Sequence, residues 1–170
     1  MTDGVEVYYP LRVGFAWTYV SKDGSSYINS VTAVNPSYPN EFTMVNLLMN
    51  KNVLFRKEGN NYVTDSFEEG TINTLLKDDA KVGDTWEIKF KANGLDSILI
   101  ITVKEVGSNR DVKGKQFENV MMIEAESKIS MNGNIMPLNY FTQYYYAKGI
   151  GLIQTTTSMG DEQSLVNCEF

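Results

Sequence analysis

The sequence predicts an all-β protein, a single antiparallel meander that forms a strongly curved sheet or a partly open β-barrel, with little helix. Three observations support this fold class. Strand-like segments recur about every 8 to 12 residues, with turn residues between them. The longest of these segments alternates with period two, and asparagine-glycine pairs follow two of them. The length of 170 residues suits one compact domain, and we expect residues 1–170 to form it.

The predicted strands are separated by short segments with the chemistry of turns. These turn segments include Lys22-Asp23-Gly24, Gly59-Asn60-Asn61, Asn93-Gly94 and Gly160-Asp161. In chain order, the predicted strands are residues 17–20, 27–34, 53–57, 62–67, 86–91, 98–106, 120–131, 134–146, 152–157 and 164–170.

Two further segments are less regular. Residues 42–49 alternate as a strand, which we favour, although Phe42, Val45 and Met49 would also share one face of a helix capped by Asn40. Residues 68–79 have turn-like ends and accommodate one short helical turn.

The clearest predicted hairpin covers residues 120–146. Its first strand alternates between apolar and polar residues, so one face packs on a core and the other faces water. Asn132-Gly133 then favours a two-residue type I′ turn, while Pro137 indicates an edge or a bulge in the returning strand. Counted from the turn, the register pairs Met131 with Asn134, Ile129 with Met136, Ala125 with Tyr140, Ile123 with Thr142 and Met121 with Tyr144.

Gly149-Ile150-Gly151 raises the question of a phosphate-binding loop. A dinucleotide-binding loop requires a third glycine and a following helix, whereas residues 152–157 continue as a β-branched strand. We therefore interpret the two glycines as the site of a bend, a bulge or a close approach of the backbone.

One short motif occurs twice and contains both tryptophans of the chain. The two copies are Val13-Gly14-x-x-Trp17 and Val82-Gly83-x-x-Trp86. We interpret each Val-Gly as the bend that begins a long strand, and each tryptophan as filling a similar hole beside that strand.

Composition argues against several classes of function. The chain has no histidine, which removes the commonest general base, the Ser-His and Cys-His nucleophile pairs and most transition-metal sites. The net charge of −6 argues against nucleic acid as a partner. Cys168 is expected to be a small buried residue, and no apolar run approaches the ~20 residues of a membrane-spanning helix. We expect no catalytic residues, no metal and no cofactor.

Four motifs, at residues 8–19, 80–88, 112–124 and 144–154, extend over most of the chain. They read YYPLRVGFAWTY, AKVGDTWEI, VKGKQFENVMMIE and YYYAKGIGLIQ. Together they resemble an uncharacterised domain family found mostly in exported proteins and lipoproteins of Bacteroidetes-type bacteria. The resemblance implies a curved antiparallel sheet like that of lipoprotein-handling half-barrels, a periplasmic or lipid-anchored location, and no known activity. The first residues lack the charged and then apolar pattern of a leader, so a cytoplasmic location is the alternative.

The tyrosines suggest where a ligand would bind. Tyr140, Tyr144 and Tyr146 are expected to form a stripe on one strand face, and core packing alone explains such a stripe. If the sheet curls without closing, the same stripe lines a concave groove for a lipid, a peptide or a glycan. We therefore predict a non-catalytic binding protein with Tyr140, Tyr144, Tyr146, Trp17 and Trp86 at its site. The alternative is a structural or protein-interaction module that uses an exposed sheet edge or rim.

Overall fold

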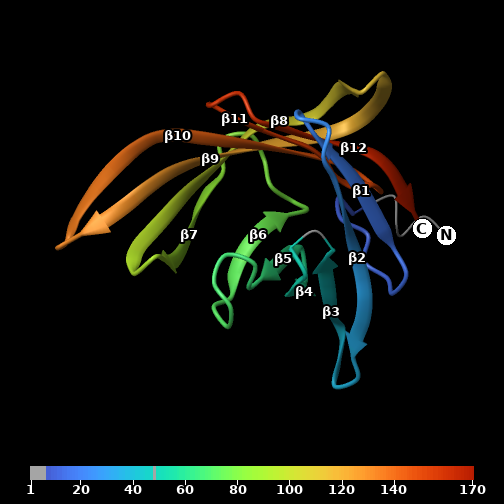
Figure 1. Cartoon of the computed structure of the whole chain (residues 1–170), viewed down its shortest axis with the longest axis horizontal. Coiled ribbons are helices and arrows are strands. Elements are labelled where there is room, and N and C mark those ends of the chain that lie inside the picture. Colours follow the sequence, from blue (N-terminus) through green and yellow to red (C-terminus); the bar gives the residue numbers. More distant parts are fainter. Residues whose placement is uncertain (1–6, 48) are drawn as a thin grey trace.

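The computed structural model describes residues 7–47 and 49–170, and these residues contain twelve strands and no helix. All twelve strands belong to one antiparallel sheet in the order β6-β5-β4-β3-β2-β1-β12-β11-β10-β9-β8-β7. The predicted meander is confirmed, because neighbours in the sheet are neighbours in the chain except where β1 meets β12. Figure 1 shows the sheet curling so that β3 to β6 lie opposite β8 to β11.

The bounds of the strands agree with most of the predicted segments. They are β1 (Ala16–Ser21), β2 (Ser26–Asn35), β3 (Tyr38–Asn46), β4 (Lys51–Glu58), β5 (Asn61–Thr64), β6 (Asn73–Lys77), β7 (Thr85–Ala92), β8 (Leu95–Val112), β9 (Lys115–Met131), β10 (Asn134–Ala147), β11 (Gly151–Thr157) and β12 (Glu162–Glu169).

Two junctions decide whether the sheet closes. β1 pairs with β12 over its whole length, with one irregularity between Thr18 and Tyr19. β6 and β7 lie at the two ends of the strand order, and the described sheet has no backbone ladder between them. The sheet is therefore a nearly closed barrel with one unsealed seam, which we call the β6–β7 seam.

The β9–β10 hairpin follows the predicted register only near its turn. Met131 pairs with Asn134 and Ile129 with Met136, as predicted. Beyond Pro137 the predicted pairs are wrong by two residues, because a bulge precedes Phe141 and Asn139 adopts a φ of 53° there. A shift of two residues leaves the inward face unchanged. The observed pairs are Ala125 with Thr142, Ile123 with Tyr144 and Met121 with Tyr146.

Each of the two less regular segments contains a strand over part of its length, while Leu47 and Met49 lie in a turn. Residues 42–46 lie in β3, so the favoured strand is confirmed there, while Leu48 lies outside the described residues. The helical turn suggested for 68–79 is wrong, since Asn73–Lys77 form β6. The register between β5 and β6 skips Leu75, and this bulge breaks the alternation that would have revealed the strand.

The longest hairpin is formed by β8 and β9, and its far end packs against β10 and β11. At its far end, Arg110 of β8 donates from Nε to Oε1 of Gln154 on β11 at 2.7 Å. The Arg110 guanidinium carbon also lies 3.6 Å from the ring centre of Tyr145 on β10. Gln154 in turn donates to the buried Ser164 hydroxyl on β12 at 3.0 Å. These contacts hold the far end of this hairpin against β10, β11 and β12.

Candidate functional site

The segment before β1 closes one end of the barrel with aromatic side chains. Tyr9 is 4% exposed, and its ring centre lies 5.1 Å from those of both Trp17 and Phe55 and 6.1 Å from that of Tyr146. These four rings come from the N-terminal segment, β1, β4 and β10. We call residues 7–11 the plug, because they bring strands from opposite sides of the barrel into contact.

A buried carboxylate attaches the plug to the barrel wall. The Asp78 side chain is 9% exposed and forms an ion pair of 3.0 Å with Lys57. It accepts hydrogen bonds from the Tyr8 backbone N–H and the Tyr62 hydroxyl, both at 3.0 Å. The Tyr62 hydroxyl also accepts the backbone N–H of Tyr9 at 3.2 Å. Burial, with a smaller contribution from Asp78, raises the pKa of Tyr62, so this hydroxyl stays protonated.

Gly149 and Gly151 allow the backbone before β11 to lie close to the plug. The Gly149 N–H donates to the carbonyl of Val7 at 2.7 Å, and the Trp17 indole donates to the carbonyl of Ile150 at 2.6 Å. A Cβ added at Gly151 would lie 3.2 Å from the Trp17 indole nitrogen and 3.4 Å from the Tyr9 ring. The close approach predicted from the glycine pair is therefore present, and side chains of this protein occupy the space beside it.

Inside the barrel, beside the plug, lies an apolar cavity of about 290 Å³. Most of its lining comes from apolar side chains of β3, β4, β6, β10 and β11. Its lining also includes a few polar groups, among them Asn29 and Ser66. The cavity is lined by Tyr9, Asn29, Met44, Asn46, Met49, Lys51, Val53, Phe55, Ser66, Phe67, Leu75, Tyr144, Tyr146 and Leu152.

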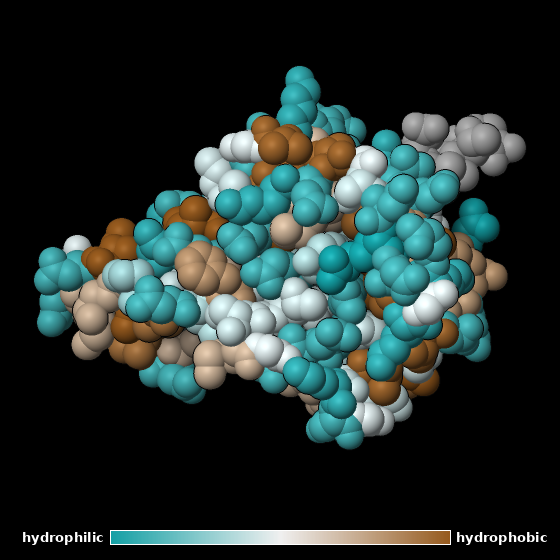
Figure 2. Space-filling model, turned by 90° about the horizontal axis from the view of Figure 1, so that it is seen from above, coloured by the Kyte–Doolittle hydropathy of each residue, from teal (hydrophilic) through white to brown (hydrophobic). Residues whose placement is uncertain are grey.

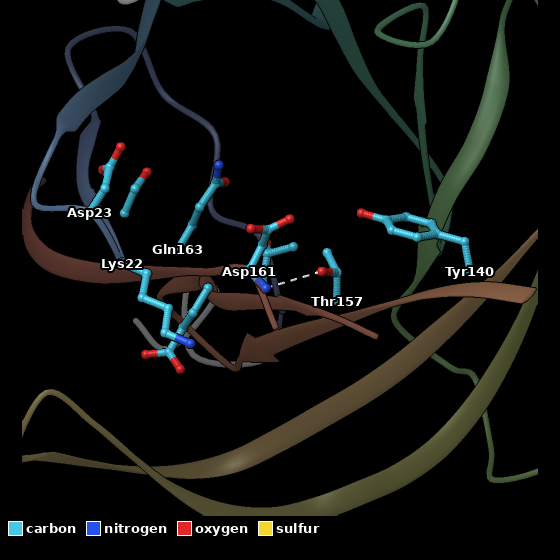
Figure 3. A pocket seen from close by; sticks show the side chains of 9 residues that line it. Lys22, Asp23, Tyr140, Thr157, Asp161 and Gln163 are labelled. Carbon is cyan, nitrogen blue, oxygen red and sulfur yellow. Dashed lines mark hydrogen bonds between the residues drawn. The ribbon is translucent and has the colours of Figure 1, made fainter. Parts of the chain in front are cut away.

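A second, polar pocket of about 600 Å³ adjoins β1, β10, β11 and β12. Figure 3 shows Gln163, Asp161, Thr157 and Tyr140 on the same side of these strands, with Lys22 and Asp23 at the border. The Asp161 backbone N–H donates to the Thr157 hydroxyl at 3.2 Å. Hydroxyl, amide and carboxylate groups around one tyrosine suit a polar ligand group.

Strand pairing brings residues of the two spaces next to each other. Thr155 lines the polar pocket and pairs with Tyr144, which lines the apolar cavity. Tyr27 donates its hydroxyl to Gln163 at 2.7 Å and stacks on Tyr19, with ring centres 5.3 Å apart. The barrel interior thus changes from aromatic at the plug, through an apolar cavity, to polar at the β11–β12 turn.

Burial raises the pKa of two tyrosine hydroxyls in this interior. It raises the pKa of Tyr144 to about 12, with a smaller contribution from Tyr140. It also raises the pKa of Tyr27 to about 12. These hydroxyls therefore act as neutral hydrogen-bonding groups near pH 7.

Side chains, in place of a backbone ladder, bridge the β6–β7 seam. Asn73 of β6 donates to the Lys89 carbonyl of β7 at 3.0 Å and accepts the Lys89 N–H at 3.2 Å. The Trp86 indole donates to the Thr74 carbonyl at 3.0 Å. Glu68 accepts the N–H of Lys91 at 2.9 Å. An amide that both donates to and accepts from one residue imitates the pairing of a neighbouring strand.

The structure places the five predicted site residues in four locations. Tyr144 and Tyr146 line the apolar cavity, whereas Tyr140 lies in the bulge between Pro137 and Phe141 and lines the polar pocket. Trp17 is fully buried against the plug. Trp86 is half-buried at the seam.

Sequence reasoning missed the opposite wall of the cavity. Met44, Val53, Phe55, Phe67 and Leu75 face Tyr144 and Tyr146 across the interior. The alternation in residues 42–46 and 53–57 was the available signal, but it identifies a buried face without showing what that face contacts.

The described part of the chain also bears on three other features: a metal site, a reactive cysteine and a membrane-spanning helix. No group of three or more Asp, Glu or Cys side chains there is arranged to hold a metal ion. Cys168 is half-buried and packs against the core, and burial raises the pKa of its thiol. None of the described segments is a helix of the length and apolarity needed to cross a membrane.

Comparisons with known proteins bear on the fold. No protein-family model matches the chain, and no curated protein does. One similar solved structure is a Bacteroides fragilis protein described as exported and as having a YmcC-like fold. It covers 96% of this chain and 99% of its own, with 12% identity and a TM-score of 0.59. This chain has the same fold.

A second structure agrees. A Parabacteroides distasonis protein described as a lipoprotein covers 96% of this chain and 98% of its own, with 12% identity and a TM-score of 0.60. At these identities the likeness establishes the fold alone. The curved antiparallel sheet, and the resemblance of this chain to exported proteins and lipoproteins of Bacteroidetes-type bacteria, are confirmed at the level of the fold.

Proposed function

We propose that this protein is a non-catalytic binding protein of the bacterial cell envelope that holds an amphipathic ligand inside its barrel. The observation that carries the proposal is the apolar cavity beside Tyr144 and Tyr146, together with the polar pocket at Tyr140 and Gln163, whose Thr155 pairs with Tyr144. Cavities that bind small molecules are mostly apolar, with a few polar groups that fix orientation, and their volumes begin at about 300 Å³.

The two spaces assign the two ends of the ligand. An acyl chain or another apolar group fits between Tyr144, Met44 and Val53, where it would replace water against apolar side chains. A hydroxylated or amide-bearing head fits the pocket of Thr155, Thr157 and Gln163. The envelope location is proposed because the B. fragilis and P. distasonis proteins with this fold are described as exported and as a lipoprotein.

Binding of a fluorescent fatty acid, dansyl-undecanoic acid, tests the proposal. Val53→Trp fills the cavity, and we expect it to raise the dissociation constant at least about tenfold, equal to ~1.4 kcal/mol. Val34→Trp is the matched control, because Val34 is 42% exposed on β2 and lies outside the cavity lining. Equal affinity in the wild type and Val53→Trp, or no binding by the wild type, would overturn the proposal. Native mass spectrometry of the gently purified protein would show a ligand retained from the cell.

The alternative function, an interaction module that uses a sheet edge, has weaker support. One such edge is the β6–β7 seam, and there Asn73 and Glu68 already occupy backbone groups of Lys89 and Lys91. A peptide that added a strand to β7 would have to displace both side chains.

A further inference from the structure

The tip of the β9–β10 hairpin exposes apolar side chains that no other described element covers. We define the tip as residues 129–138 together with Leu95. Met131, Ile135, Met136, Leu138 and Leu95 are 44%, 59%, 47%, 49% and 41% exposed. Figure 2 shows apolar atoms at the left end of the molecule, where Figure 1 places this hairpin.

The exposed side chains cover both faces of the ribbon. Ile135 pairs with Ser130 and Met136 with Ile129, and successive residues of a strand point to opposite faces. A flat protein surface would cover one of these side chains and leave the other in water. A medium that surrounds the ribbon buries both.

The distribution of charge also favours such a medium. The sequence has no charged residue between Lys128 and Lys148, although the chain as a whole has a net charge of −6. The charges nearest the turn are Lys128, opposite Pro137, and Asp96, opposite Ser130. Ser130 lies three residues before Gly133, or about 10 Å along the strand. This uncharged depth matches the ~5–10 Å to which apolar side chains enter the boundary of headgroups and acyl chains.

We propose that the tip inserts into the surface of a phospholipid bilayer. Because none of the residues of the tip is charged, zwitterionic lipid is sufficient, and anionic lipid opposes binding by repelling the negatively charged body. The open edge of β10 keeps the insertion shallow, since β10 pairs with β11 only from Thr142 onward. Backbone groups of residues 134–140 on that edge require water or lipid headgroups. Pro137 has no N–H to satisfy.

Flotation with phosphatidylcholine vesicles tests the proposal. The full chain is expected to float with the vesicles, and Ile135→Ser with Met136→Ser lowers its partition coefficient about tenfold or more. Met159→Ser with Val166→Ser is the matched control, because it removes side chains that are 75% and 51% exposed elsewhere and leaves partitioning unchanged. Adding phosphatidylglycerol weakens binding at low ionic strength, and added salt restores it. The cavity variant Val53→Trp floats like the wild type, which separates this inference from the proposed function.

A fluorescence measurement locates the insertion. In a Cys168→Ser background, an environment-sensitive dye on Met131→Cys shifts to shorter wavelength with vesicles, whereas a dye on Ser37→Cys in the exposed β2–β3 turn does not shift. Circular dichroism confirms that each variant folds. The proposal is overturned if the wild type does not float, if the control pair loses as much binding as the tip pair, or if both dyes respond alike. The proposal is also overturned if a tip substitution leaves vesicle binding unchanged but converts a dimer in solution to a monomer. That result would assign the tip to contact with a second copy of the chain.

Discussion

The two Val-Gly-x-x-Trp motifs have the same backbone and different neighbours. Gly14 donates its N–H to the Val31 carbonyl, and Gly83 donates its N–H to the Val103 carbonyl, both at 2.9 Å. The N–H of Val31 in turn donates to the carbonyl of Phe15, and the N–H of Val103 donates to the carbonyl of Asp84, also at 2.9 Å. The two glycines have φ of 99° and 95°. Both motifs therefore begin the first strand of a hairpin in the same way.

The difference lies on the other side of that strand. β1 pairs with β12 in a backbone ladder, whereas the hydrogen bonds between β7 and β6 are made by side chains. Trp17 is fully buried and donates to Ile150, while Trp86 is half-buried and donates to Thr74. A short motif determines its own turn, and the strand that arrives beside it determines whether the barrel closes.

Replacing each tryptophan by alanine should give the largest difference between the two motifs. Trp17→Ala removes a fully buried ring in contact with Tyr9 and Phe170, so we expect a loss of about 3–5 kcal/mol of unfolding free energy. Trp86→Ala removes a half-buried ring and is expected to cost about 2 kcal/mol. Urea unfolding followed by circular dichroism measures both. Equal losses would show that the seam depends on its tryptophan as strongly as the closed junction does.

Replacing the motif glycines should remove that difference. A Cβ at Gly14 or at Gly83 meets no atom within 4 Å, so only the positive φ opposes the change. Gly14→Ala and Gly83→Ala are therefore each expected to cost about 1–2 kcal/mol in the same urea assay. Gly151→Ala is the contrast, because its Cβ would also crowd the Trp17 indole, and it should cost more than either. Unequal costs at Gly14 and Gly83 would mean that the two turns differ in the strain they tolerate.

These motifs also show how far the sequence alone can lead. Val-Gly-x-x-Trp predicted a bend, a strand and a filled hole, because those features depend on residues close together in the chain. The partner of Trp86 could not be predicted, since Thr74 lies in a strand whose alternation is broken by the Leu75 bulge. The register beyond Pro137 failed for a similar reason. Counting from the turn cannot detect the extra residues that Asn139 accommodates with its positive φ.

The candidate site was predictable on one wall only. Tyr144 and Tyr146 belong to a strand whose inward face follows from alternation. Met44 and Val53 belong to strands that reach the same cavity only because the whole meander curls. Closure of the sheet is a global property, and local pattern contains no measure of how far each junction bends the next strand.

A smaller effect is expected at the seam itself. Asn73→Ala removes both hydrogen bonds to Lys89, and because these are partly exposed we expect a loss of about 1 kcal/mol. Hydrogen exchange at the Lys89 amide should accelerate, while amides of the β1–β12 ladder remain protected. Asn52→Ala, at an exposed position of β4, is the control for removing an asparagine side chain from a strand. Unchanged exchange at Lys89 would show that the Asn73 side chain does not replace the missing backbone ladder.

The smallest effect concerns the cation that covers the seam tryptophan. The Lys77 ammonium lies 5.0 Å from the ring centre of Trp86, across the β6–β7 seam. An exposed cation–π contact of this kind contributes about 0.5 kcal/mol, so Lys77→Met should raise the exchange rate of the Trp86 indole proton about twofold. The chain has only two tryptophans, so their indole signals in a two-dimensional NMR spectrum report the two motifs separately. The Trp17 signal is the internal control, because Trp17 lies fully buried against the plug. If both indole protons exchange faster, the seam and the closed junction open together, and the distinction between them would be one of geometry and not of local stability.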